Sequence, residues 1–158
     1  MNVTEKTERN SQIRSAGVKL NEFYAGQTFT TQSIEITKES LTQFAAEFDP
    51  QYMHLDEEKA KAGRFNGIIA SGIQTMAVSF KLWVETGSYG EDIIAGTAMN
   101  HIKFIKPVYP GDVLHCLVNV IEVKEKRNET GLVTVRLATF NQNDEQVFEG
   151  ELTVLIKK

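Results

Sequence analysis

The sequence contains a single cysteine, Cys116, among 158 residues. One cysteine excludes an intrachain disulfide and any zinc site built on several cysteines. The apolar stretches are interrupted well short of the ~20 residues that a membrane-spanning helix needs, and the opening MNVTEKTERN lacks the apolar core of a secretory signal. A basic excess, which is usual in nucleic-acid-binding proteins, is also missing because the net charge is −4. We therefore expect a cytoplasmic protein that binds neither nucleic acid nor a membrane.

The residues that are present have the composition of an ordinary globular domain, with 41% hydrophobic and 24% charged residues. A chain of this length corresponds to one domain and buries enough surface to fold without disulfides. Residues 1–19 are polar and lack an apolar period, which predicts a flexible N-terminal arm or, alternatively, an ordered extension over a neighbouring subunit. Residues 20–158 contain no linker or repeat and are predicted to form a single domain.

A first helix is predicted over residues 37–48. Thr37 is a suitable N-cap residue, and Glu39 places a carboxylate in the first turn, near the positive end of the helix dipole. The helix is expected to end at Asp49, because a residue that precedes proline disfavours the helical conformation. Apolar residues recur on one face with helical spacing at Leu41, Phe44, Ala45 and Phe48.

A second, more apolar helix is predicted to begin at Ser71. Ser71 and Gln74 have the spacing of a capping box, which makes Ser71 the N-cap and Gly72 the first helical residue. Because most of the following side chains are apolar, we expect this helix to be buried. Its buried face is predicted to consist of Ile73, Met76, Ala77, Phe80, Trp83 and Val84, widened by Val78 and Leu82.

The remainder of the chain predicts strands. Long strands joined by short turns are expected to pair as antiparallel neighbours. The simplest way to bury both kinds of element is an α+β fold in which a long antiparallel sheet is wrapped around a buried central helix. The predicted strands span residues 27–36, 97–105, 112–126, 132–141 and 146–157.

Reactive side chains concentrate in residues 48–56, FDPQYMHLD. Asp49 is fixed by the helix end, and His54 follows five residues later, so a turned loop can bring both to one space. A carboxylate and an imidazole around one water form a general acid–base pair. Histidine suits this role because its ordinary pKa is near neutrality. A plain helix stop beside a structural histidine is the alternative interpretation.

The start of the second helix is a further chemical feature. The first N–H groups of a helix have no internal acceptor and carry partial positive charge. Gly72 has no side chain to block approach, so its N–H suits an oxygen that develops negative charge. Ordinary capping without a ligand is the alternative. A nucleophilic role for Ser71 is disfavoured because the sequence has no Gly-x-Ser-x-Gly elbow.

Three stretches, FAAEFDPQYMHLDEEKA, FNGIIASG and FIKPVYPGDVL, together resemble the MaoC-like dehydratase family, which includes the (R)-specific enoyl-CoA hydratases. The resemblance covers residues 20–158 and implies a hot-dog fold, an antiparallel sheet wrapped around a long helix. It also implies a homodimer or a dimer of dimers with sheets joined edge to edge, acting on an acyl-CoA or acyl-carrier thioester in fatty acid metabolism.

The resemblance assigns roles by position. Asp49 and His54 match the catalytic pair that activates water, and Gly72 matches the glycine whose N–H polarises the thioester carbonyl. The implied reaction adds water to a 2-enoyl thioester or removes it, without a metal or an organic cofactor, since coenzyme A is part of the substrate. A hot-dog thioester hydrolase and a non-catalytic acyl-CoA-binding subunit are the alternatives. The candidate substrate-binding residues are Ser71, Tyr52, Phe104 and Lys106.

Overall fold

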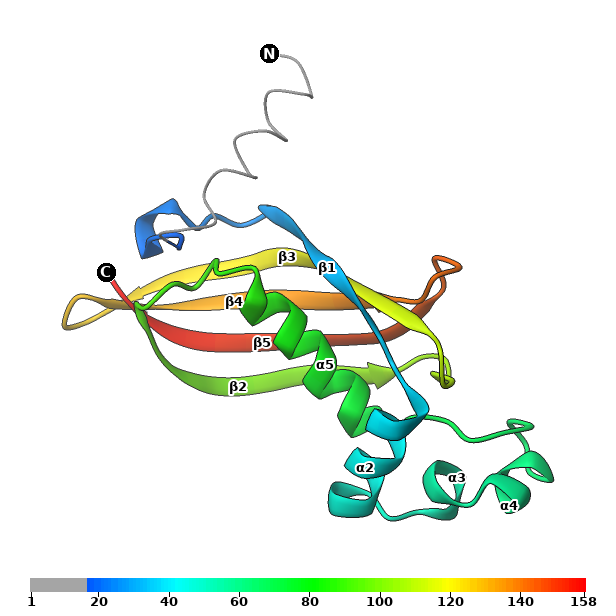
Figure 1. Cartoon of the computed structure of the whole chain (residues 1–158). Helices are drawn as coiled ribbons and strands as arrows, with labels where there is room; N and C mark the ends of the chain where they lie inside the picture. Colours follow the sequence, from blue (N-terminus) through cyan, green and yellow to red (C-terminus); the bar gives the residue numbers. More distant parts are fainter. Residues whose placement is uncertain (1–16) are drawn as a thin grey trace.

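The computed structural model describes residues 17–158. A five-stranded antiparallel sheet carries one long helix, α5, across one face, and three smaller helices gather beyond one end of that helix (Figure 1). The strands are β1 (Thr28–Glu35), β2 (Ile93–Phe104), β3 (Val113–Lys126), β4 (Thr130–Phe140) and β5 (Gln146–Lys157). The helices are the 3-10 turn η2 (Leu20–Glu22), α2 (Lys38–Phe48), α3 (Tyr52–Leu55), α4 (Glu57–Lys61) and α5 (Gly72–Glu85). The predicted α+β architecture, a sheet wrapped against a central helix, is confirmed.

The strand order in the sheet is β1-β3-β4-β5-β2, with every pair antiparallel. The expectation that neighbours in sequence pair with one another is correct for β3, β4 and β5. It is wrong for β2 and β3, which are separated by β4 and β5. The connection between them contains Pro107 and Pro110, which have no N–H to donate to a ladder. The carbonyl of Val108 instead accepts from the N–H of Ala70 at 2.8 Å. This connection therefore crosses the end of the sheet, and β2 becomes an edge strand.

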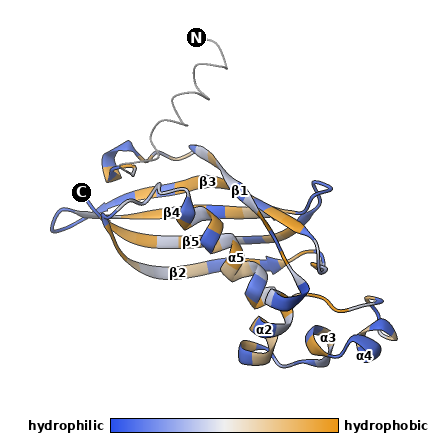
Figure 2. Ribbon diagram, viewed as in Figure 1, coloured by the Kyte–Doolittle hydropathy of each residue, from blue (hydrophilic) through white to orange (hydrophobic). Residues whose placement is uncertain are grey.

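The inner sheet strands show the alternation that a half-buried sheet requires. Along β4 and β5 every second residue is buried, and Figure 2 shows hydrophobic positions recurring along these strands. β2 differs, since nearly its whole length is exposed, and it begins at Ile93 rather than at the predicted residue 97. Gly96, which is a poor strand former, accounts for the missed start.

The helix α2 has the predicted cap and end. Thr37 Oγ1 accepts from the N–H of Ser40 at 3.1 Å, and the N–H of Asp49 closes the last turn on the carbonyl of Ala45 at 2.9 Å. Of its apolar face only Leu41 and Ala45 are fully buried, whereas Phe48 is 66% exposed. The chain then forms the short helices α3 and α4.

The helix α5 begins as predicted, with Ser71 as its N-cap, but the capping box is not formed: Ser71 Oγ accepts from the N–H of Ile73 rather than from that of Gln74. The expected burial is also wrong for much of the helix. Trp83 and Leu82 are buried, but the rest of the buried face is polar. It consists of Gln74, Thr75 and Ser79, while the apolar side chains of Ile73, Phe80 and Val84 are exposed.

The N-terminal arm predicted over residues 1–19 lies mostly outside the described residues. Residues 17–19 of the predicted arm are described, and among them Val18 is 3% exposed and donates its N–H to the carbonyl of Ser88 at 2.7 Å. The packed domain therefore includes residues from Gly17 onward rather than from residue 20. None of the helices between residues 17 and 158 is long and apolar enough to cross a membrane.

Candidate active site

Three segments meet where α2 ends and α5 begins. Asp49 directly follows α2, and His54 lies on the single turn of α3, not on the predicted loop. The N–H of Ile69 donates to the carbonyl of Met53 at 3.0 Å, which fixes the segment before α5 against α3. As a result, Asp49, His54 and Ser71 come from separate elements and meet in the folded chain.

Asp49 is held by hydrogen bonds on both carboxylate oxygens. Ser71 Oγ donates to Oδ2 at 2.6 Å, and Gln51 Nε2 donates to Oδ1 at 2.7 Å. These two bonds, first that from Ser71 and then that from Gln51, lower the pKa of the Asp49 carboxyl, with a smaller contribution from nearby His54. Asp49 is therefore a carboxylate at neutral pH and can accept a proton.

His54 is 6% exposed and is oriented from both sides. Its Nδ1 lies 2.6 Å from the carbonyl oxygen of Ile69, and because a carbonyl only accepts, Nδ1 carries a hydrogen. Its Nε2 then lies 3.2 Å from Asp49 Oδ2. The imidazole and the carboxylate therefore face one another in the geometry of an acid–base pair.

Ser71 is fully buried and links the pair to α5. Its hydroxyl donates to Asp49 and accepts from the N–H of Ile73 at 3.2 Å. A hydroxyl whose hydrogen is bonded to a carboxylate in this way positions that carboxylate. This geometry agrees with the prediction that Ser71 is not a nucleophile.

Gly72 is the first residue of α5, and no acceptor for its N–H occurs within residues 17–158. A Cβ at this position would lie 2.7 Å from the ring of Phe104 at the end of β2. The ring therefore packs where only glycine leaves room. Phe104, a predicted substrate-binding residue, is accordingly brought beside the helix start and is 55% exposed.

The other two candidate substrate-binding residues have different side-chain contacts. Tyr52 is 45% exposed on α3, and Lys59 Nζ lies 4.7 Å from its ring centroid. Lys106 Nζ forms an exposed ion pair with Glu145 Oε1 at 2.9 Å. Within the described chain, neither side chain has a hydrogen bond to Asp49.

Sequence reasoning missed two supporting groups. Gln51 lies between Asp49 and His54 in sequence, and asking which donor satisfies a partly buried carboxylate would have found it. The carbonyl of Ile69, which orients His54, could not be found in this way because a backbone group carries no residue signature.

The arrangement is suited to acid–base chemistry on one small molecule. A carboxylate, an imidazole and an unpaired helix N–H converge, and within residues 17–158 no group of three or more His, Cys, Asp or Glu side chains has the arrangement of a metal site. The general acid–base pair and the anion-stabilising N–H expected from the sequence are thus close together in space.

The family model of the MaoC-like domain matches residues 21–142. This chain is a member of the MaoC-like dehydratase family. Membership indicates hydratase or dehydratase chemistry in general, and the five-stranded sheet with its central helix is the hot-dog fold of that family.

Three relatives illustrate the family match. The Bacillus subtilis protein YdeM, itself uncharacterized, is 63% identical over 141 residues, which is 89% of this chain and 100% of that protein. The 3-hydroxyacyl-thioester dehydratase Z of Mycobacterium tuberculosis is 31% identical over 104 residues, covering 65% of this chain and 69% of that one. The crystal structure of a MaoC-like dehydratase from Rhodospirillum rubrum superposes with a TM-score of 0.83 at 32% identity, covering 90% of this chain and 98% of that one.

Proposed function

We propose that this protein adds water across the double bond of a 2-enoyl thioester and catalyses the reverse dehydration of a 3-hydroxyacyl thioester. The observation that carries the proposal is the contact between His54 Nε2 and Asp49 Oδ2, 3.2 Å apart, with Asp49 also bonded to the N-cap of α5. The name of the Mycobacterium tuberculosis relative, a 3-hydroxyacyl-thioester dehydratase, supports the thioester as the substrate class.

The thioester carbonyl oxygen is placed at the N–H of Gly72, which has no partner within residues 17–158. As water attacks C3, the electron pair of the double bond moves towards this oxygen, which develops negative charge. A preorganised donor stabilises that charge, and the loss of one such donor typically raises the barrier by ~2.7–4 kcal/mol.

Asp49 and His54 bind the attacking water between them. The oxygen–C3 bond forms, one water proton passes to the pair, and the pair delivers one proton to C2. The pair therefore ends the cycle in the protonation state in which it began, and dehydration is the same sequence in reverse. Acid–base assistance of this kind contributes about 10²–10⁴-fold to the rate.

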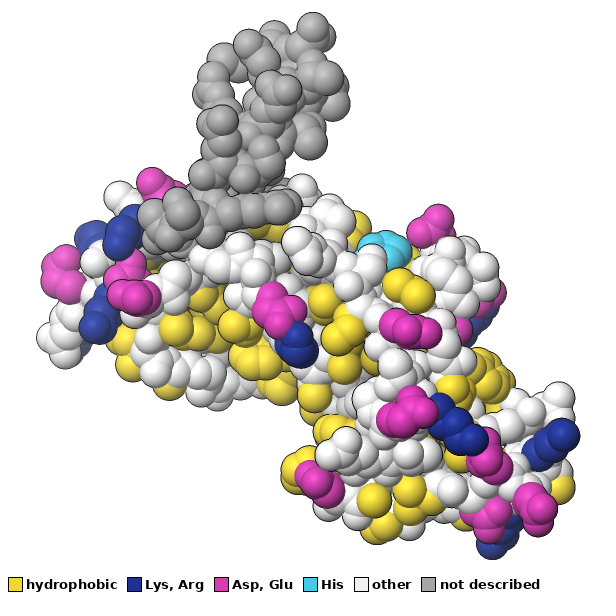
Figure 3. Space-filling view, in the orientation of Figure 1, with side chains coloured by type: hydrophobic (Ala, Val, Ile, Leu, Met, Phe, Trp, Pro, Cys, Tyr) yellow, Lys and Arg dark blue, Asp and Glu magenta, His cyan; other side chains and the backbone are white. Residues whose placement is uncertain are grey.

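The working unit is a homodimer in this proposal. β2 is a 12-residue edge strand that is exposed along nearly its whole length, and an unpaired edge is a template for another strand. Beside it, α5 presents Ile73 and Phe80, which are 45% and 38% exposed. Figure 3 shows hydrophobic side chains gathered along the middle of this face. Pairing of β2 with β2 of a second copy would extend the sheet and cover this apolar surface.

The test is the hydration of crotonyl-CoA by purified wild-type and variant protein, followed as the loss of enoyl absorbance. Asp49→Asn and His54→Ala are each expected to lower kcat at least 100-fold, because each removes half of the acid–base pair. Asp56→Asn is the matched control: it replaces a carboxylate of the same segment that caps α4, and asparagine also caps. An undiminished rate in folded Asp49→Asn contradicts the proposal, and release of free thiol identifies a thioester hydrolase instead.

A further inference from the structure

A groove of about 350 Å³ lies between α2 and α5. Its near end is beside the candidate active site, because Phe48 directly precedes Asp49 and Gln74 lies one turn after Ser71 on the same face of α5. Its far end is lined by Lys81, seven residues beyond Gln74, so the groove runs for about 10 Å along the helix at 1.5 Å per residue.

Both walls of this groove contain apolar side chains, with polar residues between them. Phe44 and Phe48 of α2 form one side, with their ring centroids 5.2 Å apart, and Ala77 and Val78 of α5 form the other. A hydrocarbon chain that leaves the reacting carbons next to Asp49 finds apolar side chains on both walls of this groove.

Gln74 is the one buried polar side chain among the described residues of this lining; the other polar lining residues, Ser40, Gln43, Glu47 and Lys81, are exposed. Gln74 is 5% exposed, and its Oε1 is buried without a hydrogen-bond partner within residues 17–158. A buried polar atom without a partner is destabilising, and native structures contain few of them. The capping box that would have given Gln74 a structural role is not formed. Its side chain therefore has an unused capacity for hydrogen bonding beside the active site.

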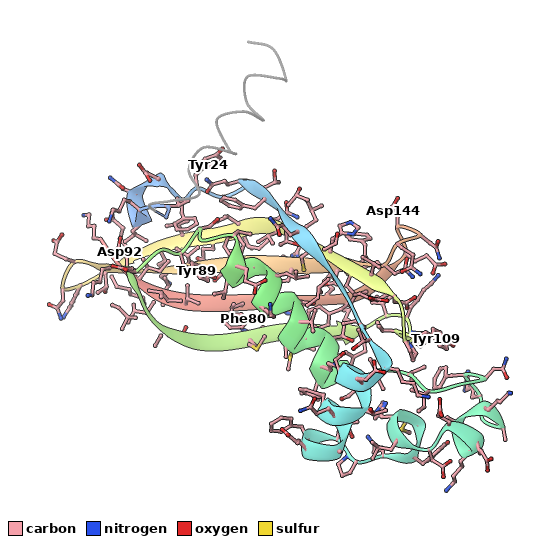
Figure 4. The ribbon with its side chains drawn as sticks, viewed as in Figure 1. Tyr24, Phe80, Tyr89, Asp92, Tyr109 and Asp144 are labelled. Carbon is pink, nitrogen blue, oxygen red and sulfur yellow. The ribbon has the colours of Figure 1, made fainter. Side chains whose placement is uncertain are left out.

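A second groove, of about 400 Å³, lies on the opposite side of α5 against β2 and provides a comparison. Its lining includes Met76, Phe80, Ala98 and Met99 and contains no polar side chain. Figure 4 labels Phe80, which lies on this side of the helix. Of these two grooves, only the one between α2 and α5 is lined by a buried side chain that has an unpaired polar atom within residues 17–158.

We infer that Gln74 determines substrate specificity and that the acyl chain of the preferred thioester carries a hydroxyl group beyond C3, which hydrogen-bonds the Gln74 carboxamide. This inference rests on the proposed function, since it takes the thioester to lie at Gly72 and its acyl chain to enter the groove between α2 and α5. A 180° rotation of the carboxamide exchanges its oxygen and nitrogen. A hydroxyl both donates and accepts, so it satisfies either orientation.

The experiment compares 2-hexenoyl-CoA with its 4-, 5- and 6-hydroxy derivatives, using wild-type protein, Gln74→Met and the control Gln32→Met. Methionine has nearly the length of glutamine but makes no comparable hydrogen bond, and Gln32 is exposed on β1, away from the groove. At least one hydroxylated substrate is expected to have a kcat/KM about tenfold above that of 2-hexenoyl-CoA in wild-type protein and in Gln32→Met. This factor corresponds to one hydrogen bond of about 1.4 kcal/mol.

In Gln74→Met this preference is expected to disappear or to reverse, while the Tm of the free protein rises because a buried polar atom without a partner has been removed. A purely structural Gln74 would instead give a lower Tm and an unchanged ratio of kcat/KM values. The inference is overturned if wild-type protein and Gln74→Met show the same ratio for every hydroxylated substrate.

A binding measurement separates this inference from the proposed function. Calorimetric titration with hexanoyl-CoA and its 4-, 5- and 6-hydroxy derivatives, which cannot be hydrated, gives the affinity ratio without turnover. If wild-type protein hydrates no enoyl thioester, the proposed function fails. The role of Gln74 in recognition is then supported if Gln74→Met loses the higher affinity for a hydroxylated thioester. It is contradicted if the variant keeps that preference.

Discussion

From Ile73 to Phe80, the two faces of α5 have the reverse of the usual polarity, whereas Leu82 and Trp83 further along are buried as usual. The face against the sheet carries Thr75 and Ser79, both at least 96% buried, while the face towards β2 and solvent carries Ile73 and Phe80. An isolated surface helix normally buries its apolar stripe and exposes its polar one. The inversion indicates that the inner face is selected for close approach and that the outer face is selected for contact with another surface.

The inner face has a physical reason to be small and polar. Ser79 Oγ lies 2.7 Å from the carbonyl of Thr75 and 2.6 Å from Thr139 Oγ1 on β4, and Thr139 in turn lies 2.9 Å from Cys116 Sγ. Small side chains let the helix approach the sheet closely, and the hydroxyl groups of Ser79 and Thr139 find partners there. We call these hydrogen-bonded residues, Thr75, Ser79, Thr139 and Cys116, the polar seam. The polar seam and the buried Trp83 together hold the helix against the sheet.

The largest expected effect is on this seam. Ser79→Leu inserts a bulky group between α5 and β4 and leaves the hydroxyl of Thr139 with fewer partners, so we expect the free energy of unfolding to fall by about 2–5 kcal/mol. Urea denaturation followed by circular dichroism measures this change. Lys81→Leu, which adds the same side chain at an exposed position of the helix, is expected to change stability by less than about 0.5 kcal/mol. Equal losses in both variants would show that the two faces do not differ.

The outer face is expected to affect association rather than folding. Phe80→Lys places a charge in the surface proposed to meet a second copy, and we expect the dimer Kd to rise about 30-fold, corresponding to the ~2 kcal/mol of an aromatic hot spot. Sedimentation velocity over a concentration series measures the Kd. The circular dichroism spectrum of the folded monomer should be unchanged. Lys81→Gln, on the side of α5 facing α2, is the control. An unchanged Kd for Phe80→Lys would show that the dimer interface does not include this face of α5.

The polarity inversion explains which parts of the fold could be predicted from the sequence. The N-cap residue Ser71 correctly predicted the start of α5, because capping depends on local sequence. Helical periodicity correctly predicted the burial of Trp83. It placed Ile73 and Phe80 on the buried face because periodicity reports that a stripe is apolar, not what covers it. The sheet order failed for the same reason: the edge position of β2 depends on a crossing connection, which no strand pattern encodes.

Sequence reasoning named residues that the structure brings together, because local signals mark them. Asp49, His54 and Gly72 are adjacent to clear helix boundaries, and their types are specific to the chemistry. The contacts of Tyr52 with Lys59 and of Lys106 with Glu145 were not predicted. Long-range partners of this kind depend on the assembled fold.

The smallest expected effect concerns the N-terminal end of α5, where Ser71 contacts Asp49. It is a change in the pH dependence of activity. The hydrogen bond from Ser71 is the main cause of the lowered pKa of the Asp49 carboxyl. A lowered folded-state pKa means that the carboxylate contributes to stability above its unfolded pKa, about 3.9, and that this contribution is lost as the pH falls through the folded value. Ser71→Ala removes the bond, so the Asp49 pKa rises and the acid limb of kcat/KM moves to higher pH.

Profiles of kcat/KM against pH for wild-type protein and Ser71→Ala measure this shift. Thr37→Ala is the matched control, since it removes the N-cap hydroxyl of α2, with a comparable loss of about 1 kcal/mol in capping, and does not touch Asp49. Its acid limb is expected to coincide with that of wild-type protein. If Ser71→Ala and Thr37→Ala give the same profile, Ser71 acts only as a cap, and the inner face of α5 supports the fold without tuning the acid–base pair.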